Sequence, residues 1–87
     1  MRVRVRVRDH DYAGYLTNIS KGGMRLSTDE VAEIWTGDRV EVLSNDFGLM
    51  TGTARWRSPG NLGVRFNDTT NNNARVNAIL RFFHLST

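Results

Sequence analysis

The chain has 87 residues, enough for one small domain whose modest core leaves no room for a deep active site. It contains no cysteine, which excludes disulfides, zinc–cysteine clusters and thiol nucleophiles. The net charge is +3, and every Lys/Arg position except Lys21 is arginine, a bias that favours bidentate and stacking contacts with phosphate or guanine.

Neither a signal peptide nor a membrane span is expected. The N-terminus carries a charge at every second residue, and no run of about eighteen apolar residues occurs. We therefore expect a soluble, cytoplasmic protein that forms one domain over residues 1–87 and makes no membrane contact.

The first predicted element, residues 2–8, is a strand because apolar and basic residues alternate strictly. One face carries Val3, Val5 and Val7, and the other carries Arg2, Arg4, Arg6 and Arg8. Like charges spaced roughly 6 to 7 Å along one face repel each other. An anionic partner would relieve this repulsion, and the alternative is a solvated arginine face.

A turn over residues 9–14 is expected next, leading into a strand over residues 15–20. Asp9, His10 and Asp11 do not indicate a metal site, because consecutive side chains diverge and no further ligands join them. In the segment that follows, Asn18 and Ser20 leave the same face of an extended strand. Gly22 and Gly23 are expected to supply the left-handed backbone of a sharp reversal. The segment is therefore predicted to be a ligand-gripping turn.

The middle of the chain reads as further short strands, over residues 24–26, 39–43, 49–57 and 62–66. Ser27 and Glu30 fit a capping box, which predicts a short helix with Val31, Ile34 and Trp35 on one face. The sequence Ser-Pro-Gly-Asn at residues 58–61 predicts a hairpin turn between the last two strands.

The C-terminal segment predicts an amphipathic helix. Val76, Ile79, Leu80 and Phe83 recur at helical spacing and form the face expected to pack on the sheet. A second stripe of Ala78, Phe82 and Leu85 is either additional core or a contact with a second subunit or a partner. Together the elements predict a mainly β fold, a small six-stranded antiparallel barrel closed by the C-terminal helix.

The pattern formed by Asn18, Ser20 and Gly23 resembles the Asp/Asn-x-Ser-x-x-Gly signature of PilZ domains, bacterial receptors for cyclic di-GMP. Two later segments, Ala54-Arg55-Trp56-Arg57 and Leu62-Gly63-Val64-Arg65-Phe66, resemble the family's Trp strand and Gly-x-x-Phe strand. The resemblance implies a split barrel, cyclic di-GMP as ligand rather than a cofactor, and a protein partner. Trp56 is then either a stacking surface for the ligand or part of the barrel core.

In PilZ domains an Arg-x-x-x-Arg segment ahead of the first strand clasps the dinucleotide together with this turn. Arg2-x-x-x-Arg6 and Arg4-x-x-x-Arg8 both fit that spacing, but they lie on the predicted first strand, and eleven residues separate Arg6 from Asn18. Either the chain lacks the arginine segment, or the outward arginines of the strand take its place. On the second interpretation the ligand-binding residues are Arg2, Arg4, Arg6, Arg8, Asn18, Ser20, Gly23 and Trp56.

Three functions remain open at this point. The resemblance favours a cyclic di-GMP receptor that relays the messenger level to a protein controlling motility, biofilm or exopolysaccharide. The alternatives are a PilZ-like adaptor that binds protein without the nucleotide, and a basic barrel that binds single-stranded nucleic acid through Tyr12, Tyr15 and Trp56. An enzyme is not expected, since neither His10 nor His84 neighbours a nucleophile with an orienting carboxylate.

Overall fold

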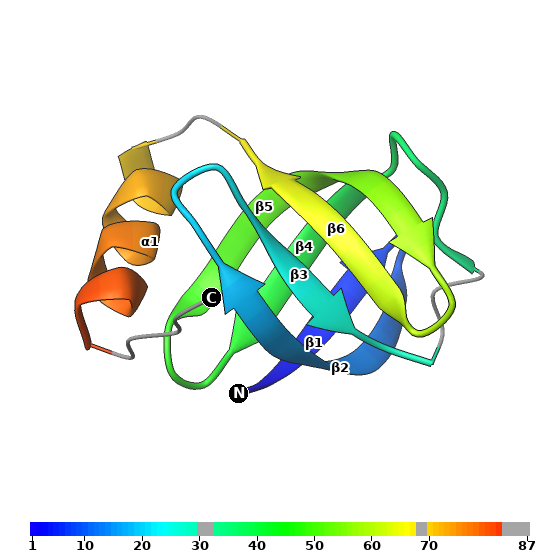
Figure 1. Cartoon of the computed structure of the whole chain (residues 1–87), viewed down its shortest axis with the longest axis horizontal. Helices are drawn as coiled ribbons and strands as arrows, with labels where there is room; N and C mark the ends of the chain where they lie inside the picture. Colours follow the sequence, from blue (N-terminus) through cyan, green and yellow to red (C-terminus); the bar gives the residue numbers. More distant parts are fainter. Residues whose placement is uncertain (30–32, 68–69, 83–87) are drawn as a thin grey trace.

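The computed structural model describes residues 1–29, 33–67 and 70–82. Six antiparallel strands form a closed barrel in the order β1-β2-β3-β6-β5-β4 (Figure 1). The elements in chain order are β1 (Arg2–Val7), β2 (His10–Ile19), β3 (Gly23–Ser27), β4 (Arg39–Ser44), β5 (Gly48–Ser58), β6 (Asn61–Phe66) and α1 (Thr70–Phe82). The predicted fold class, a small six-stranded barrel with a C-terminal helix, is confirmed.

The alternation in β1 directs its valines into the barrel and its arginines to solvent, as predicted. The turn that follows is much tighter than expected. Arg8 and Asp9 both have positive φ, 49° and 67°, so that β2 pairs with β1 from His10 onward. This left-handed pair is the geometry of a two-residue hairpin turn, which usually contains Gly or Asn. The predicted turn over residues 9–14 is wrong because this turn has no glycine to mark it.

The β2–β3 connection is also a two-residue hairpin turn, in which the Ser20 N–H donates to the Gly23 carbonyl oxygen over 2.9 Å. Our prediction that Gly22 and Gly23 adopt left-handed backbone is wrong, because neither has positive φ. Gly23 is instead required by close packing. A Cβ there would lie 2.3 Å from the carbonyl oxygen of Val64 in β6, whereas nothing lies within 4 Å of a Cβ on Gly22.

The helix predicted between β3 and β4 lies partly outside the described residues. Ser27 belongs to β3, and Glu30 and Val31 lie outside the described residues. Ile34 is fully buried whereas Trp35 is 59% exposed, so the two do not share a face. The indole of Trp35 is covered by the Arg57 guanidinium, whose carbon lies 4.2 Å from the ring centroid. The two hydrophobic residues were assigned to one face because helical spacing alone could not show which of them the barrel covers.

The last three strands follow the prediction closely. Pro59 and Gly60 form the turn between β5 and β6, and Gly60 has the positive φ, 78°, that a glycine at this position supplies. A bulge interrupts the β5–β6 pairing, because Ala54 pairs with Val64 but Trp56 pairs with Gly63. The bulge leaves Arg55 as the extra residue and bends this part of β5 outward.

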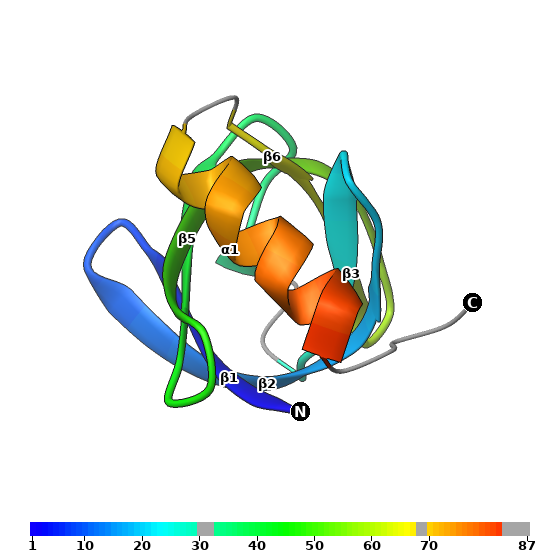
Figure 2. The same cartoon turned by 90° about the vertical axis from the view of Figure 1, so that its left-hand side faces the viewer.

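The helix α1 crosses one open end of the barrel (Figure 2). Val76 and Ile79 are buried in the core and Leu80 packs against it, which confirms the predicted inner face at these positions. The buried Asn72 amide fixes the helix to β5, donating to the Thr51 carbonyl oxygen over 2.8 Å and accepting from the Thr51 N–H over 3.2 Å.

Phe83, the last residue predicted for the inner face, lies outside the described residues. The second stripe is only partly described: Ala78 is exposed, which excludes it from the core, while Leu85 lies outside the described residues. The dimer contact predicted for this stripe stays a prediction.

No helix in the described part of the chain is both long and apolar enough to cross a membrane.

Candidate functional site

An open groove of about 610 Å³ runs over the outer surface of the barrel, from the β2–β3 turn across β3 and β6 to β5. Figure 1 shows β3 and β6 on the side facing the viewer. The groove brings together four of the predicted site residues, Asn18, Ser20, Gly23 and Trp56. Its polar or glycine lining is Asn18, Ser20, Gly22, Gly23, Arg25, Arg55, Gly63 and Arg65, and we call it the Ser20 groove.

The turn end of the groove is held by backbone contacts. The Gly22 carbonyl oxygen accepts from the N–H of Phe66 over 2.9 Å, and Gly23 pairs with Arg65 in the β3–β6 ladder. The Ser20 hydroxyl is exposed and makes a long contact of 3.4 Å, donating to the Gly23 carbonyl oxygen. The turn is therefore anchored to β6, and its hydroxyl is free to turn toward a ligand.

Trp56 lies at the other end of the groove, and it is 45% exposed. The interpretation of Trp56 as barrel core is wrong, because the bulge at Arg55 leaves Ala54 buried while Trp56 emerges on the outside. Its indole lies over Gly63, where a Cβ would be 2.1 Å from the indole Nε1. Glycine at this position lets the ring lie directly on the β6 backbone, with one side still open.

Three arginines that our sequence analysis did not assign to the site surround this surface. Arg25, Arg55 and Arg65 are exposed and line the groove. The Arg25 Nε donates to the Thr17 hydroxyl over 3.3 Å, which holds the side chain toward the neighbouring strand β2. Arg25 and Arg65 each lie between buried residues on their strands, and this alternation indicates that both face outward. The sequence does not show that β3, β6 and β5 lie next to one another in the sheet, so it could not assign these arginines to one site.

Asn18 is half-buried at the edge of the groove, next to the turn. Its Oδ1 is buried and accepts no hydrogen bond from any residue in the described ranges. An unpaired buried acceptor costs about 1 to 3 kcal/mol. Rotation of the side chain toward the groove would expose this oxygen to a donor.

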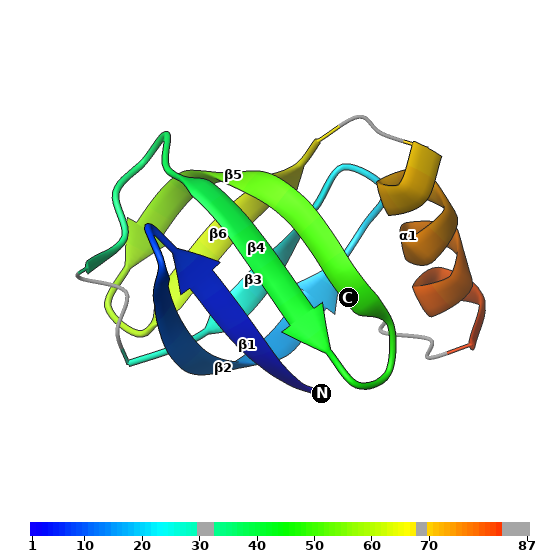
Figure 3. The same ribbon diagram turned by 180° about the vertical axis from the view of Figure 1, so that it is seen from behind.

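The arginine strand does not contribute to the groove. In the closed barrel β1 lies three strands from β6, so the outward side chains of the two strands point in opposite directions. Figure 3 shows β1 and β4 on the side of the molecule opposite that of Figure 1. The expected clasp between the arginine strand and the turn is therefore not formed: none of Arg2, Arg4, Arg6 and Arg8 lines the Ser20 groove. The alternation of valine and arginine predicted correctly that these arginines face outward. It could not show on which side of the barrel they lie, because that depends on the order of the strands.

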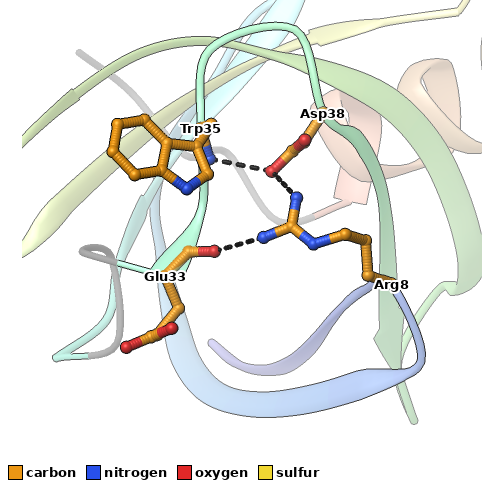
Figure 4. Close-up of polar contacts among 4 residues, drawn as sticks. All are labelled: Arg8, Glu33, Trp35 and Asp38. Carbon is orange, nitrogen blue, oxygen red and sulfur yellow. Dashed lines mark hydrogen bonds and ion pairs between the residues drawn. The ribbon is translucent and has the colours of Figure 1, made fainter.

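Two of these arginines are held by carboxylates of the fold. Arg6 pairs with Asp11 on β2 at 2.8 Å, and this hydrogen bond raises the arginine pKa and lowers the pKa of Asp11. Arg8 pairs with Asp38 at 2.5 Å and donates to the Glu33 carbonyl oxygen over 2.7 Å (Figure 4). Both side chains stabilise the turns at the end of the barrel remote from α1.

Asp38 lies at the centre of a cluster of polar contacts with Arg8, Glu33 and Trp35, which we call the Asp38 cluster. Its Oδ2 accepts from the Trp35 N–H over 2.8 Å as well as from Arg8, as Figure 4 shows. The backbone hydrogen bond from Trp35 is the main reason that the pKa of Asp38 is lowered, and the Arg8 guanidinium adds to it. The carboxylate ties the β1–β2 turn to the loop that carries Trp35.

The family model of the PilZ domain matches residues 1–84. The chain belongs to the PilZ domain family. PilZ domains are cyclic di-GMP receptor and adaptor domains, and the closed barrel with one C-terminal helix is consistent with their fold. Comparison with curated proteins and with solved structures gives no significant match.

Within this PilZ domain, the positions that match the family signature, Asn18, Ser20 and Gly23, all line the groove. In the part of the chain that the structure describes, no three His, Cys, Asp or Glu residues gather as metal ligands would. The arrangement offers hydrogen bonds, positive charge and an aromatic surface, which are the means to bind an anionic, planar molecule.

Proposed function

We propose that this PilZ domain binds cyclic di-GMP in the Ser20 groove and relays its presence to a partner protein. The observation that carries the proposal is the convergence of Asn18, Ser20 and Gly23 with Trp56 in one groove. Asn18, Ser20 and Gly23 come from β2, β3 and the turn between them. Trp56 comes from β5, which the sheet separates from β3 only by β6. The volume of about 610 Å³ lies in the range of small-molecule sites.

The chemistry of the groove suits the ligand. Cyclic di-GMP presents two phosphates and two guanines, and an arginine fork can bridge a phosphate or the O6/N7 edge of guanine. Arg25, Arg55 and Arg65 line the same groove as Trp56, on whose exposed indole a guanine can stack. Ser20 can reach a phosphate or base, and the Asn18 amide gains the hydrogen bond that it lacks in the free protein.

The expected affinity is modest. Each good bidentate contact contributes about 1 to 3 kcal/mol, and stacking on an aromatic side chain contributes about as much for each base. Association costs at least about 4 kcal/mol, so a few such contacts give micromolar binding. Binding involves no bond making or breaking, so no catalytic residue is required.

Isothermal titration calorimetry with cyclic di-GMP tests the proposal. We expect Ser20→Ala and Arg65→Gln each to weaken binding about tenfold, the effect of roughly 1.4 kcal/mol. Arg39→Gln is the matched control, because Arg39 is an exposed arginine on β4 that does not line the groove. Absence of heat at millimolar ligand, together with unchanged amide shifts, would refute nucleotide binding.

The adaptor without nucleotide is the second candidate, and one observation favours it. Arg6 and Arg8 each belong to one of the two arginine pairs that fit the spacing of the family's arginine segment, and they are paired with Asp11 and Asp38 on the far side of the barrel. If cyclic di-GMP does not bind, the pairing of these two arginines with carboxylates would explain the lack of binding.

Nucleic-acid binding has less support, because Tyr15 is exposed on β2, which lies three strands from the Trp56 strand β5. Titration with a short single strand, after cyclic di-GMP, separates the remaining functions.

A further inference from the structure

The turn that precedes β4, residues 35–38, is bonded to β5 at the place where the bulge begins. The Gly37 N–H donates to the Ala54 carbonyl oxygen over 2.7 Å, and the Ala54 N–H donates to the Asp38 carbonyl oxygen over 2.9 Å. Both backbone polar groups of Ala54 are therefore held by this turn. The extra residue of the bulge comes directly after Ala54, and Trp56 follows it into the Ser20 groove.

The place of the bulge decides which way Trp56 points. Side chains alternate between the two faces of a strand, and one extra residue reverses the alternation beyond it. Ala54 is buried and Trp56 is exposed because the bulge lies between them. A bulge placed beyond Trp56 would instead turn the indole toward the core. The contacts that fix Ala54 therefore also fix the indole at the surface.

The side chain of Asp38 closes the turn. Its Oδ2 accepts from the Trp35 N–H over 2.8 Å, while the Asp38 N–H donates to the Trp35 carbonyl oxygen over 3.0 Å. Arg8 donates to the same Oδ2 over 2.5 Å and ties the carboxylate to the β1–β2 turn (Figure 4). Gly37 has a φ of 98°, and glycine alone permits many conformations, so the contacts of the carboxylate select this one.

We propose that Asp38 is a positioning residue for the ligand site, whose carboxylate holds the turn that fixes the bulge and so directs the Trp56 indole outward. Asp38 itself does not line the Ser20 groove. Its effect on affinity rests on the proposed function, that is, on a guanine stacked on Trp56. Its effect on the direction of the indole is independent of any ligand.

The direction of the indole can be measured by fluorescence without ligand. In Trp35→Phe, Trp56 is the one remaining tryptophan of the chain. The replaced indole takes no part in the hydrogen bonds of the turn, which come from the backbone of residue 35. Adding Asp38→Ala to this variant should lower the quenching of Trp56 emission by acrylamide and move the emission to shorter wavelength, because part of the population then has the indole turned inward.

Calorimetry with cyclic di-GMP gives the second readout. Asp38→Ala should weaken binding about tenfold. Asp38→Asn should weaken it less than about threefold, because the amide oxygen can still accept from the Trp35 N–H. Asp11→Ala is the matched control and should bind as the native protein does, since Asp11 also pairs with an arginine of β1 but does not contact the turn.

Gly37→Ala disturbs the same turn in a second way, which matters if Asp38→Ala does not fold. Nothing lies within 4 Å of a Cβ on Gly37, but alanine is strained at its positive φ. This variant should lower the quenching of Trp56 and weaken ligand binding in the same direction as Asp38→Ala.

Native quenching of Trp56 in Asp38→Ala and Gly37→Ala would overturn the proposal. Lower quenching with native affinity would show that Asp38 does not act on the ligand site. Equal weakening by Asp11→Ala would reduce the effect to a general loss of stability. If the native protein binds no cyclic di-GMP, the proposed function fails, and the quenching of Trp56 alone then decides whether Asp38 directs the indole.

Discussion

Both sides of the barrel are rich in arginine, yet they differ in what surrounds the guanidinium groups. In the Ser20 groove, Arg25 and Arg65 flank an indole that rests on a glycine, with no carboxylate among the lining residues. On β1, Arg6 and Arg8 are bound by Asp11 and Asp38. A run of arginines along one strand therefore does not by itself indicate an anion site. The neighbours across the strands decide which positive charges remain available.

Gly23→Val gives the largest effect that we expect, and it tests how the groove is built. The new side chain would collide with the Val64 carbonyl oxygen, since even a Cβ would lie 2.3 Å away and the obstacle is backbone. We expect a loss of about 3 kcal/mol or more in the free energy of unfolding, and a fall in Tm of more than about 10 °C.

Gly22→Ala is the matched control, because no atom lies within 4 Å of a Cβ at Gly22. Its Tm should stay close to that of the native protein. Equal stability of Gly23→Val and Gly22→Ala in thermal unfolding would show that the turn is not anchored to β6 as described.

The two tryptophans provide the second test, because each stands beside arginines on a different part of the surface. Trp56→Ala should weaken cyclic di-GMP binding about tenfold or more, the effect of removing one stacked base. Trp35→Ala should leave the affinity unchanged, since Trp35 packs against Arg57 and does not line the groove. Quenching of tryptophan emission by the ligand should persist in Trp35→Phe and vanish in Trp56→Phe. The reverse pattern would place the ligand near the Asp38 cluster.

Acid titration gives the smallest effect and concerns the arginines that the fold already uses. The pKa of Asp38 is lowered from its ordinary value of 3.8 by the Trp35 N–H and by Arg8. A carboxyl whose folded pKa is depressed stabilises the fold above its unfolded pKa, and this contribution is lost as pH falls through the folded value. Tm should therefore decrease below about pH 4, and Asp38→Asn should reduce that decrease.

Asp11→Asn is the control for this acid titration. Asp11 is paired with Arg6 on an exposed surface, where ion pairs contribute little, so its replacement should change the pH profile less. Profiles of Asp38→Asn that match the native protein would mean that the Arg8–Asp38 pair does not stabilise the turns.

Much of the fold could be predicted because it depends on local patterns. A strand, a turn and a helix could each be predicted from residues close together in the sequence. These residues are the alternating valines and arginines of β1, the Pro59–Gly60 pair, and Val76 and Ile79 at helical spacing. The strand order was not local. The strand order places Arg25 and Arg65 in the same groove as Trp56 and Arg6 on the other side of the barrel. No pattern within a single strand predicts this arrangement.

Two local features also escaped the sequence analysis, for separate reasons. The turn at Arg8 and Asp9 takes positive φ without a glycine or asparagine to indicate it. The bulge at Arg55 changes the face to which Trp56 points, although strict alternation would place it with Ala54. Three of the predicted site residues that line the groove, Asn18, Ser20 and Gly23, were found through the family signature, whereas Arg25, Arg55 and Arg65 required the barrel.

The most direct test of the central claim is a titration of the 15N-labelled protein with cyclic di-GMP, followed by amide shifts on both sides of the barrel. The account predicts that residues 18–25, 55–56 and 63–65 shift together with one dissociation constant, while residues 2–8 stay in place. Arg6→Ala should then bind the ligand with native affinity. Shifts of residues 2–8 as large as those of the groove, with loss of binding in Arg6→Ala, would contradict the account and restore the arginine strand as part of the site.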